Sequence, residues 1–429
     1  MAMIVSPARA YRAEAEAPLP LWPVVLMISA YPIWFLLGLG GFMWVGFAAP
    51  MTASLVRRRD LKAPRGMGLW AVFLLAVVIS GLSIDTPARF SGYALRLGYY
   101  LAATVFVIYL LNGGQTVSVA RIVRSFTVLW MVTIAFGYLA LILGDASFHS
   151  PMWYLMPATL LQNDFIATLV TPGFADVQDI IGVPVPRPKA PFPYTNSWGS
   201  MVALTTPFAL IALSDARVDL PRRLVKITLA AAVVPIVVSL NRGLWLSLGI
   251  GLAYVALRLG FGGHRHILQR FALLVVALVA VVVLSPLGDL VSARIDNGHS
   301  DGDRTALATA AIEGATERPI FGWGAPRPNV GSQPSVGTHG QIWLVTFSHG
   351  FVGAAGFIGA LGSFLYWTRR QTTTSGVLAN SVLLIALVQM PVYLMIPHSL
   401  FAVMAALAVA LRYQTNIEDG PTRDALQPA

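Results

Sequence analysis

Long apolar segments alternate with short polar ones along almost the whole chain. Gly68–Ile84, for example, is long and apolar enough for one membrane crossing. Two segments are too long for one, because a helix rises about 1.5 Å per residue and a bilayer core is about 30 Å thick. Leu21–Val56 is interrupted near Gly38–Gly41 and Leu224–Leu259 at Asn241-Arg242-Gly243, so each is predicted to form two spans. The other predicted spans are Gly92–Leu111, Ser125–Leu143, Ser197–Leu213, Phe271–Leu287 and Ile342–Trp367, with two more in Val377–Arg412.

Lysine and arginine gather in the polar segments between these spans, most densely at Arg57, Arg58 and Arg59. Short cytoplasmic loops carry such an excess. Placing every cluster inside gives about twelve crossings with both termini in the cytoplasm. We therefore predict an all-α polytopic membrane protein with a membrane domain at 21–412 and cytoplasmic tails at 1–20 and 413–429. Two long outer loops are expected, at about 144–195 and 288–340, the second containing a surface helix.

Composition supports a membrane protein. Of the 429 residues, 56% are hydrophobic and 11% charged, whereas soluble domains carry about 25% charged residues. The net charge of +10 lies in clusters between spans, so we expect contact with membrane lipids and no nucleic acid. Cysteine is absent, which excludes a disulfide framework, a thiolate metal site and a thiol nucleophile. The polar N-terminal stretch is followed by a span without an obvious cleavage site, which favours a tail over a signal peptide.

Arg242 stands in a minimal turn between two apolar helices. A guanidinium at the membrane surface lies at the depth of lipid phosphates, with which its planar fork forms bidentate pairs. The alternative is an interfacial arginine that reaches ordinary headgroups.

Arg187 and Lys189 lie in a proline-rich stretch, VPRPKAPFPYTNSW, that also contains Asn196 and leads into a predicted span. Proline stiffens the backbone into an extended form. A stiff strap carrying cations near the membrane suits an anionic headgroup. A solvated linker is the alternative.

His339 begins a predicted span in VGTHGQIWL. Histidine titrates near neutral pH and is the usual side chain for taking a proton from a hydroxyl. A structural or solvated histidine is the alternative. His349 lies further into the same predicted span, away from easy access to water, and is predicted to be a packed polar residue. His149, His264, His266, His299 and His398 have no spaced partner and receive no role.

Asp301 and Asp303 form a D-x-D pair, a pattern that holds a divalent metal in nucleotide-sugar transferases. Asp303, however, precedes a helical pattern that stops at Pro319, so helix N-capping is the preferred explanation and no metal site is predicted. Arg304 is expected on that surface helix. The turn Phe321-Gly322-Trp323-Gly324 after it should let backbone approach the membrane closely.

Taken in order, these motifs resemble the O-antigen ligase and O-antigen polymerase-like membrane proteins. The stretch Arg187–Asn196 is similar to the family's R-x-x-G-x-F-x-x-x-N segment, and Ser239–Trp245 resembles its S-x-[ST]-R-[GS]-x-[WL] turn. Arg304–Gly353 is similar to its R…P-[IL]-x-G-x-G…H-N-x-x-L…G-[LI]-x-G stretch. Gly340, Ala190 and Asn241 depart from the family's asparagine, glycine and hydroxyl residue.

The resemblance implies an inverting transfer of glycan from a polyprenyl (undecaprenyl) diphosphate donor to a glycan or glycolipid acceptor, without metal, nucleotide or cofactor. It implies that Arg187 and Arg242 hold the donor diphosphate and that His339 deprotonates the acceptor. Lys189, Asn196 and Arg304 are expected to help bind substrate. The site would face outward from a bacterial cytoplasmic membrane. The enzyme would take part in the synthesis of surface polysaccharides such as lipopolysaccharide.

Two other functions are considered, and the motifs do not separate the first of them from ligation. Polymerisation of lipid-linked repeat units would use the same motifs with a different acceptor. A flippase or transporter usually keeps ionisable residues or broken helices near the bilayer midplane and often has repeated halves. The central parts of nearly all predicted spans lack charge, with Arg96 the nearest exception, and no internal repeat is visible.

Overall fold

The computed structural model describes residues 18–162, 164–179, 184–284, 299–327 and 335–415. The described chain is mostly helical. Five of its helices, α5, α6, α10, α13 and α17, are long and apolar enough to cross a membrane, which indicates a multi-pass membrane protein. Both predicted tails lie largely outside the described residues, as do 285–298 of the second loop.

The helices follow the apolar segments of the sequence. In chain order they are α1 (Trp22–Ile28), α2 (Tyr31–Leu36), α3 (Met43–Leu55), α4 (Met67–Ser80), α5 (Pro87–Leu111), α6 (Val119–Leu143), α7 (Pro151–Leu155), α8 (Ala158–Leu161), α9 (Asp164–Val170), α10 (Thr195–Ser214), α11 (Arg222–Ala231), α12 (Val233–Val238), α13 (Arg242–Phe261), α14 (Arg265–Leu284), α16 (His299–Glu317), α17 (Gln341–Thr368), α18 (Thr374–Gln389) and α19 (His398–Thr415), with a short 3₁₀ turn η1 (Gly81–Ser83) after α4.

The centre of the bundle is formed by α10, α18 and α19, which contact one another and are buried along almost their whole length. Peripheral helices instead expose apolar side chains. Leu75 on α4 is 61% exposed and Leu273 on α14 is 69% exposed. Such a surface is stable in hydrocarbon and not in water, so lipid is the expected neighbour of these helices.

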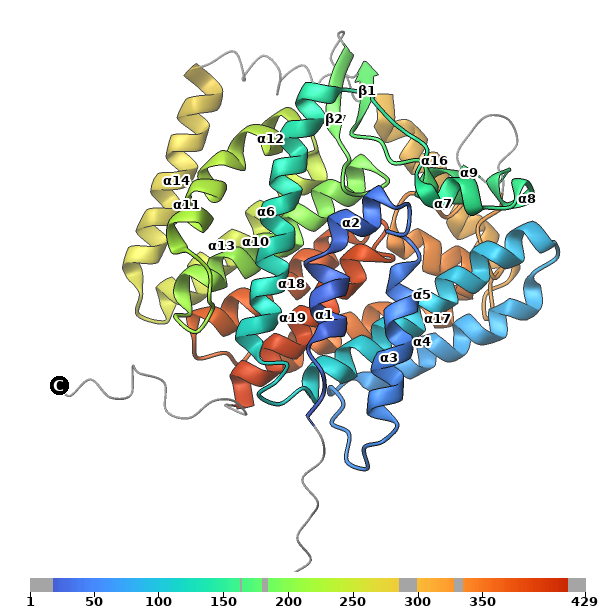
Figure 1. The fold of residues 1–429 in the computed structure, drawn as a ribbon, viewed down its shortest axis with the longest axis horizontal. Helices are drawn as coiled ribbons and strands as arrows, with labels where there is room; N and C mark the ends of the chain where they lie inside the picture. The colour runs from blue at the N-terminus through green and yellow to red at the C-terminus, as the bar shows by residue number, and fades with distance from the viewer. Residues whose placement is uncertain (1–17, 163, 180–183, 285–298, 328–334, 416–429) are drawn as a thin grey trace, which may run out of the picture.

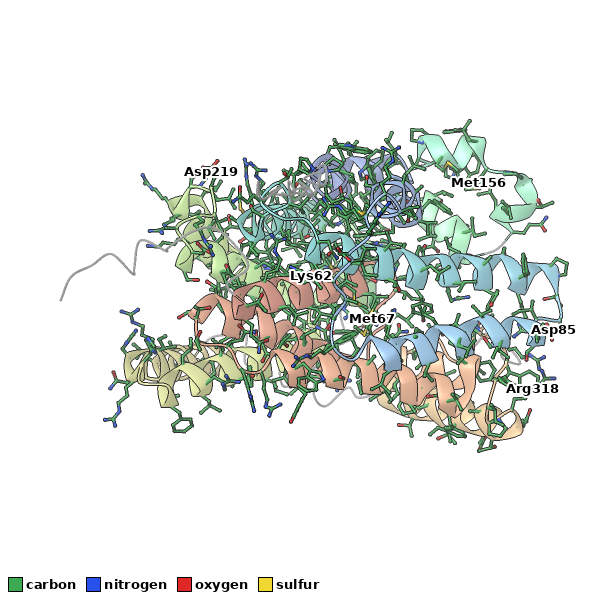
Figure 2. The ribbon with its side chains drawn as sticks, turned by 90° about the horizontal axis from the view of Figure 1, so that it is seen from below. Lys62, Met67, Asp85, Met156, Asp219 and Arg318 are labelled. Atoms are coloured by element: carbon green, nitrogen blue, oxygen red, sulfur yellow. The ribbon has the colours of Figure 1, made fainter. Side chains whose placement is uncertain are left out.

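The elements of the two long loops lie together. β1, β2, α7, α8, α9 and α16 gather along the upper and right-hand side of the molecule, whereas α1 begins and α19 ends toward the opposite side (Figure 1). We call this side the loop end. Asp85 and Arg318 lie at one extremity of the molecule and Asp219 toward the other (Figure 2).

Two predicted interruptions are present. The chain turns between α2 and α3, at residues 37–42, and between α12 and α13, where α13 begins at Arg242. The first limb of each predicted hairpin, however, is divided into two short helices, α1 with α2 and α11 with α12. Pro32 and Pro235 lie at or near these divisions, where a missing amide donor breaks the helical bonding pattern.

The prediction of an all-α protein is wrong for the first loop, which contains an antiparallel pair of strands, β1 (Ala175–Asp179) and β2 (Pro184–Pro188). Backbone groups of consecutive strand residues point to opposite edges, so prolines at 184, 186 and 188 can share the unpaired edge. Lys189 continues the pairing on the other edge, where its amide donates to the Phe174 carbonyl at 3.0 Å. The proline spacing therefore permits a strand at the rim of the sheet.

Candidate functional site

A cavity of about 810 Å³ lies among the segments of the loop end. This volume is large enough for a small ligand, or for the reacting groups of a larger substrate. Its walls come mainly from the start of α5, the first loop with the start of α10, residues 325–326 and 335–339, and the connection from α18 to α19. The polar side chains that matter below are Arg89, Arg96, Gln178, Tyr194, Asn196, His339 and His398.

The second loop is held beside this cavity by a break in α17. Gly350 has a φ of 68° inside the helix, which frees carbonyl groups of the preceding turn. Trp323 donates its amide to the Phe347 carbonyl at 3.0 Å, and Gly324 donates to that of Ser348 at 2.7 Å. A Cβ at Gly322 would lie 2.6 Å from backbone atoms of 348–350. The turn thus packs closely on the backbone of α17, and only glycine allows this approach; its predicted approach to the membrane stays a prediction.

Arg89 fastens the same loop to α5. Its guanidinium donates to the backbone carbonyls of Trp323 and Ala325, each at 2.7 Å, and to that of Pro326 at 3.3 Å. It also pairs with Asp85 at 2.5 Å. Hydrogen bonds from Arg89 and then Arg327 hold the pKa of Asp85 below its ordinary value. Arg89 thus lines the cavity as part of its wall.

His339 lines the cavity immediately before α17 begins. Its Nδ1 lies 3.2 Å from the Thr338 hydroxyl. The next residue, Gly340, leaves no room for a side chain, because a Cβ there would lie 2.4 Å from the Pro391 carbonyl oxygen. This contact explains glycine at a position where the resembled family carries asparagine. It also fixes the backbone that presents His339.

Arg187 joins β2 to the turn that carries Arg242. It is 8% exposed, and its Nε donates to the Ser239 carbonyl at 3.0 Å. Its Nη1 donates to Oε1 of Gln178 at 2.7 Å, and Gln178 lines the cavity. The two arginine motifs therefore meet, although 52 residues separate Arg187 from Ser239. Neither Arg187 nor Arg242 is among the residues that line the cavity itself.

The turn before Arg242 is tightly built. Leu240 has a φ of 49°, a strained conformation for a residue with a branched side chain. Asn241 caps α13 by accepting the Leu244 amide at 3.4 Å, donates to the Thr195 carbonyl at 3.3 Å, and accepts a hydrogen bond from the Tyr393 hydroxyl. Arg242 is the first residue of α13. An amide side chain here binds three partners at once, which a hydroxyl residue would not reach.

The remaining predicted residues divide between the cavity and its surroundings. Asn196, in the first turn of α10, lines the cavity. Lys189 pairs with Asp176 at 2.8 Å, and Asp176 lines the cavity. Arg304 lies on the surface helix α16 as expected, but its side chain, like those of Asp301 and Asp303, is outside the described residues. Because α16 begins at His299, Asp303 lies inside the helix, and the predicted N-cap is wrong.

Several cavity residues received no site role from the sequence, Arg96 and His398 among them. Arg96 was noted only as a charge within an apolar span, yet that is the signal that marks functional ionisable residues in membranes. His398 lines the cavity and contacts the Tyr31 hydroxyl through Nε2 at 2.5 Å; no spacing in the sequence connects these two residues. His349 is 1% exposed and its Nδ1 contacts Ser80 Oγ at 2.8 Å, so the prediction of a packed polar residue is confirmed.

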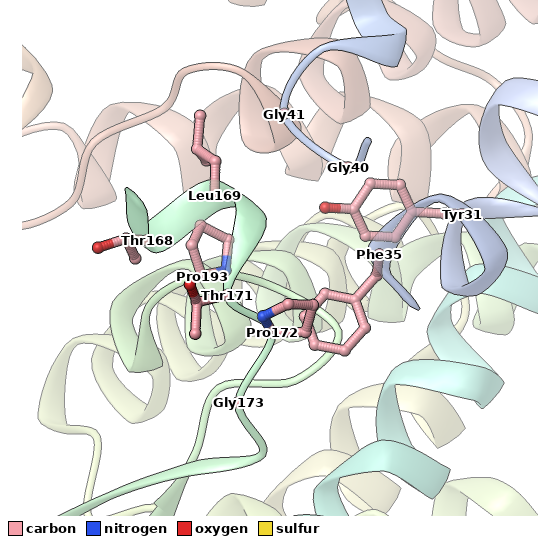
Figure 3. Close-up of a pocket in the computed structure, with 10 residues that line it drawn as sticks. All are labelled: Tyr31, Phe35, Gly40, Gly41, Thr168, Leu169, Thr171, Pro172, Gly173 and Pro193. Atoms are coloured by element: carbon pink, nitrogen blue, oxygen red, sulfur yellow. The ribbon is translucent and has the colours of Figure 1, made fainter. Parts of the chain in front are cut away.

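A second, much smaller cavity lies beside the first, between the turn after α2 and the end of α9 (Figure 3). Thr168, Leu169 and Pro193 line both cavities. Its volume of about 10 Å³ is close to that of one water molecule. It shows how closely the first loop packs on the N-terminal helices and is too small for a substrate.

Comparison with models of known protein families and with the sequences of characterised proteins finds no match to this chain.

Proposed function

We propose that this protein is an integral-membrane glycosyltransferase of the O-antigen ligase type. It transfers a glycan from a polyprenyl-diphosphate carrier to an acceptor hydroxyl at the outer face of a bacterial cytoplasmic membrane. One arrangement carries the proposal: His339 and Asn196 line a single large cavity, and Arg187, bound to Gln178 in its wall, is joined to the turn of Arg242. Motifs far apart in the sequence thus lie around one site.

In the proposed reaction, Arg187 and Arg242 hold the diphosphate of the donor. The bond between the sugar carbon and the diphosphate oxygen breaks, and the guanidinium groups stabilise the charge that grows on that oxygen.

His339 takes the proton of the acceptor hydroxyl as its oxygen bonds to the sugar carbon from the opposite face. The result is an inverted glycosidic bond and a free polyprenyl diphosphate. Asn196 is placed in the cavity wall to donate or accept hydrogen bonds with sugar hydroxyls. Lys189 acts through its ion pair with Asp176, which orients the end of the first loop.

The direct test incubates the purified protein in detergent or nanodiscs with a polyprenyl-diphosphate glycan and candidate acceptors, and identifies the product by mass. We expect acceptor carrying the glycan, released polyprenyl diphosphate, and undiminished turnover with a chelator. If the sole acceptor used is a second lipid-linked glycan, the enzyme is a polymerase. If no acceptor is glycosylated by the wild-type protein, the proposal is wrong.

Site variants give the same experiment a second readout. Arg187→Ala, Arg242→Ala and His339→Ala should each lower the transfer rate by about 100-fold or more, the usual effect of removing a positioned charge or base. Arg121→Ala is the matched control, because Arg121 donates to the Thr116 carbonyl on an exposed part of α6. Unchanged transfer by His339→Ala would reassign the base to another cavity residue.

A further inference from the structure

Arg96 lies two helical turns further into α5 than Arg89, at a depth of about 10 Å for seven residues. A guanidinium at such depth within a membrane span is costly and needs a polar surrounding. It finds one here, because Arg96 lines the cavity together with Tyr194, Asn196 and His339. It is therefore reached from the cavity and not from lipid.

The helix provides space for the guanidinium. A Cβ at Gly92, one turn before Arg96, would lie 2.9 Å from Arg96 Nη1. Helical side chains point toward the N-terminus of their helix. The guanidinium is accordingly folded back along α5 over the bare backbone of Gly92, toward the loop end. The Phe165 ring lies on its other side, with its centroid 5.5 Å from Cζ.

Within the described part of the chain, the Arg96 guanidinium has neither a hydrogen-bond acceptor nor a carboxylate partner. Its neighbours of electrostatic importance are the hydroxyl groups of Tyr99, Tyr100 and Tyr194. The Tyr99 hydroxyl is buried and itself has no partner among these residues. Of these tyrosines only Tyr194 lines the cavity, beside Arg96. A guanidinium that lines a cavity and has no acceptor among the described residues is suited to bind an oxyanion, and phosphate matches it in shape and charge.

We propose that Arg96 binds a phosphate group of a substrate inside the cavity. This inference rests on the proposed function, and the phosphate can come from the lipid diphosphate donor or from a phosphorylated acceptor. Arg187 and Arg242 are not among the residues that line the cavity, so Arg96, which lines it and has no hydrogen-bond acceptor among the described residues, offers a phosphate a further cation inside the cavity.

The test compares binding of a short-chain polyprenyl diphosphate to the full-length protein and to Arg96→Gln, which keeps the shape of the stem and removes the charge. We expect the dissociation constant to rise about 10- to 100-fold, the loss of one charge-assisted hydrogen-bonded pair. Arg96→Lys should recover part of the affinity, and Arg121→Gln, a remote control on α6, should bind as wild type does. Gel filtration and the thermal unfolding midpoint show that each variant is folded.

A second arm locates the phosphate. Transfer rates are measured with one acceptor in phosphorylated and dephosphorylated forms. If Arg96→Gln leaves diphosphate binding intact but removes the preference for the phosphorylated acceptor, the phosphate belongs to the acceptor. If both diphosphate binding and acceptor preference match wild type, the inference is overturned while the proposed function stands. If the wild-type protein binds diphosphate through Arg96 but glycosylates no acceptor, the inference stands and the proposed function fails. If it binds no diphosphate at all, both fail.

Discussion

Arg89 and Arg96 lie seven residues apart on one face of α5, and both line the same cavity. Arg89 is saturated: it donates to three backbone carbonyls of the second loop and pairs with Asp85. Arg96 contacts an aromatic ring and, within the described residues, binds no carbonyl or carboxylate. Arg89 therefore has a structural role, whereas Arg96, two turns further along the helix, remains accessible to a ligand. The set of partners distinguishes them, whereas charge and location do not.

Replacing Arg89 by alanine should give the largest effect on stability. The change leaves the carbonyls of Trp323 and Ala325 without their donor and Asp85 without its main partner. We expect the free energy of unfolding to fall by about 1–3 kcal/mol, since the part-buried carbonyls lose hydrogen bonds from a charged group. The thermal midpoint in detergent and protease sensitivity of residues 318–340 measure the change.

The matched variant is Arg121→Ala, which removes one exposed bond to Thr116 and should shift the midpoint little. Equal shifts for the two variants would contradict a structural role for Arg89. By the same comparison, Arg96→Gln should leave the midpoint close to wild type, because it breaks no hydrogen bond among the described residues and removes a charge from the membrane.

Gly92→Ala should affect ligand binding without altering charge. The new Cβ would meet Arg96 Nη1 at 2.9 Å and push the guanidinium out of its preferred rotamer. A displaced rotamer costs about 0.5–1.5 kcal/mol, so affinity for polyprenyl diphosphate should fall roughly two- to tenfold. Gly249→Ala on α13 is the control, since a Cβ there meets nothing within 4 Å. Binding of the Gly92 variant as tight as that of the control would show that the guanidinium does not need this space.

Asp85 should give the smallest effect, confined to acid. Arg89 and Arg327 hold its folded-state pKa below the ordinary value. Its contribution to stability is therefore complete above the unfolded-state pKa of about 4 and is lost as pH falls through the lower folded-state pKa. The thermal midpoint of Asp85→Asn should be insensitive to this titration, whereas that of the wild type should decline further below about pH 4. Because Asp85 is 47% exposed, solvent screens the interaction and the difference should be small. Parallel declines in the two proteins would argue against the Arg89–Asp85 link.

The local sequence predicted the helices and their interruptions. Burial in lipid requires continuous apolar segments, and a short run of polar residues ends each of them. The start of α13 at Arg242 follows from the few residues involved. The strand β2 does not follow from its own residues, because its proline-rich segment forms a sheet only when Ala175–Asp179 lies alongside. That pairing depends on the rest of the first loop.

The sequence supplied candidate residues for the site but not their geometry: His339 and Asn196 line the cavity, whereas Arg187 and Arg242 do not. His339 and Asn196 reach the cavity because the chain turns at their helix starts, which the sequence indicates. The difference between Arg89 and Arg96 depends on carbonyl acceptors from the second loop, and every residue type carries a carbonyl. No sequence pattern identifies which carbonyls will be close. The rotation of α5 that turns Arg96 toward the cavity is likewise set by packing.

The break at Gly350 also has a consequence for how the protein is made. Within lipid, the Phe347 and Ser348 carbonyls would have no partner until the 323–324 amides arrive. Insertion of α17 into the membrane and docking of the 321–324 turn must then occur together. The turn has to lie at the membrane surface when α17 inserts. We expect halves of the chain split between residues 324 and 341 to reassemble poorly when expressed separately, whereas halves split in the polar stretch between α10 and α11 should reassemble well.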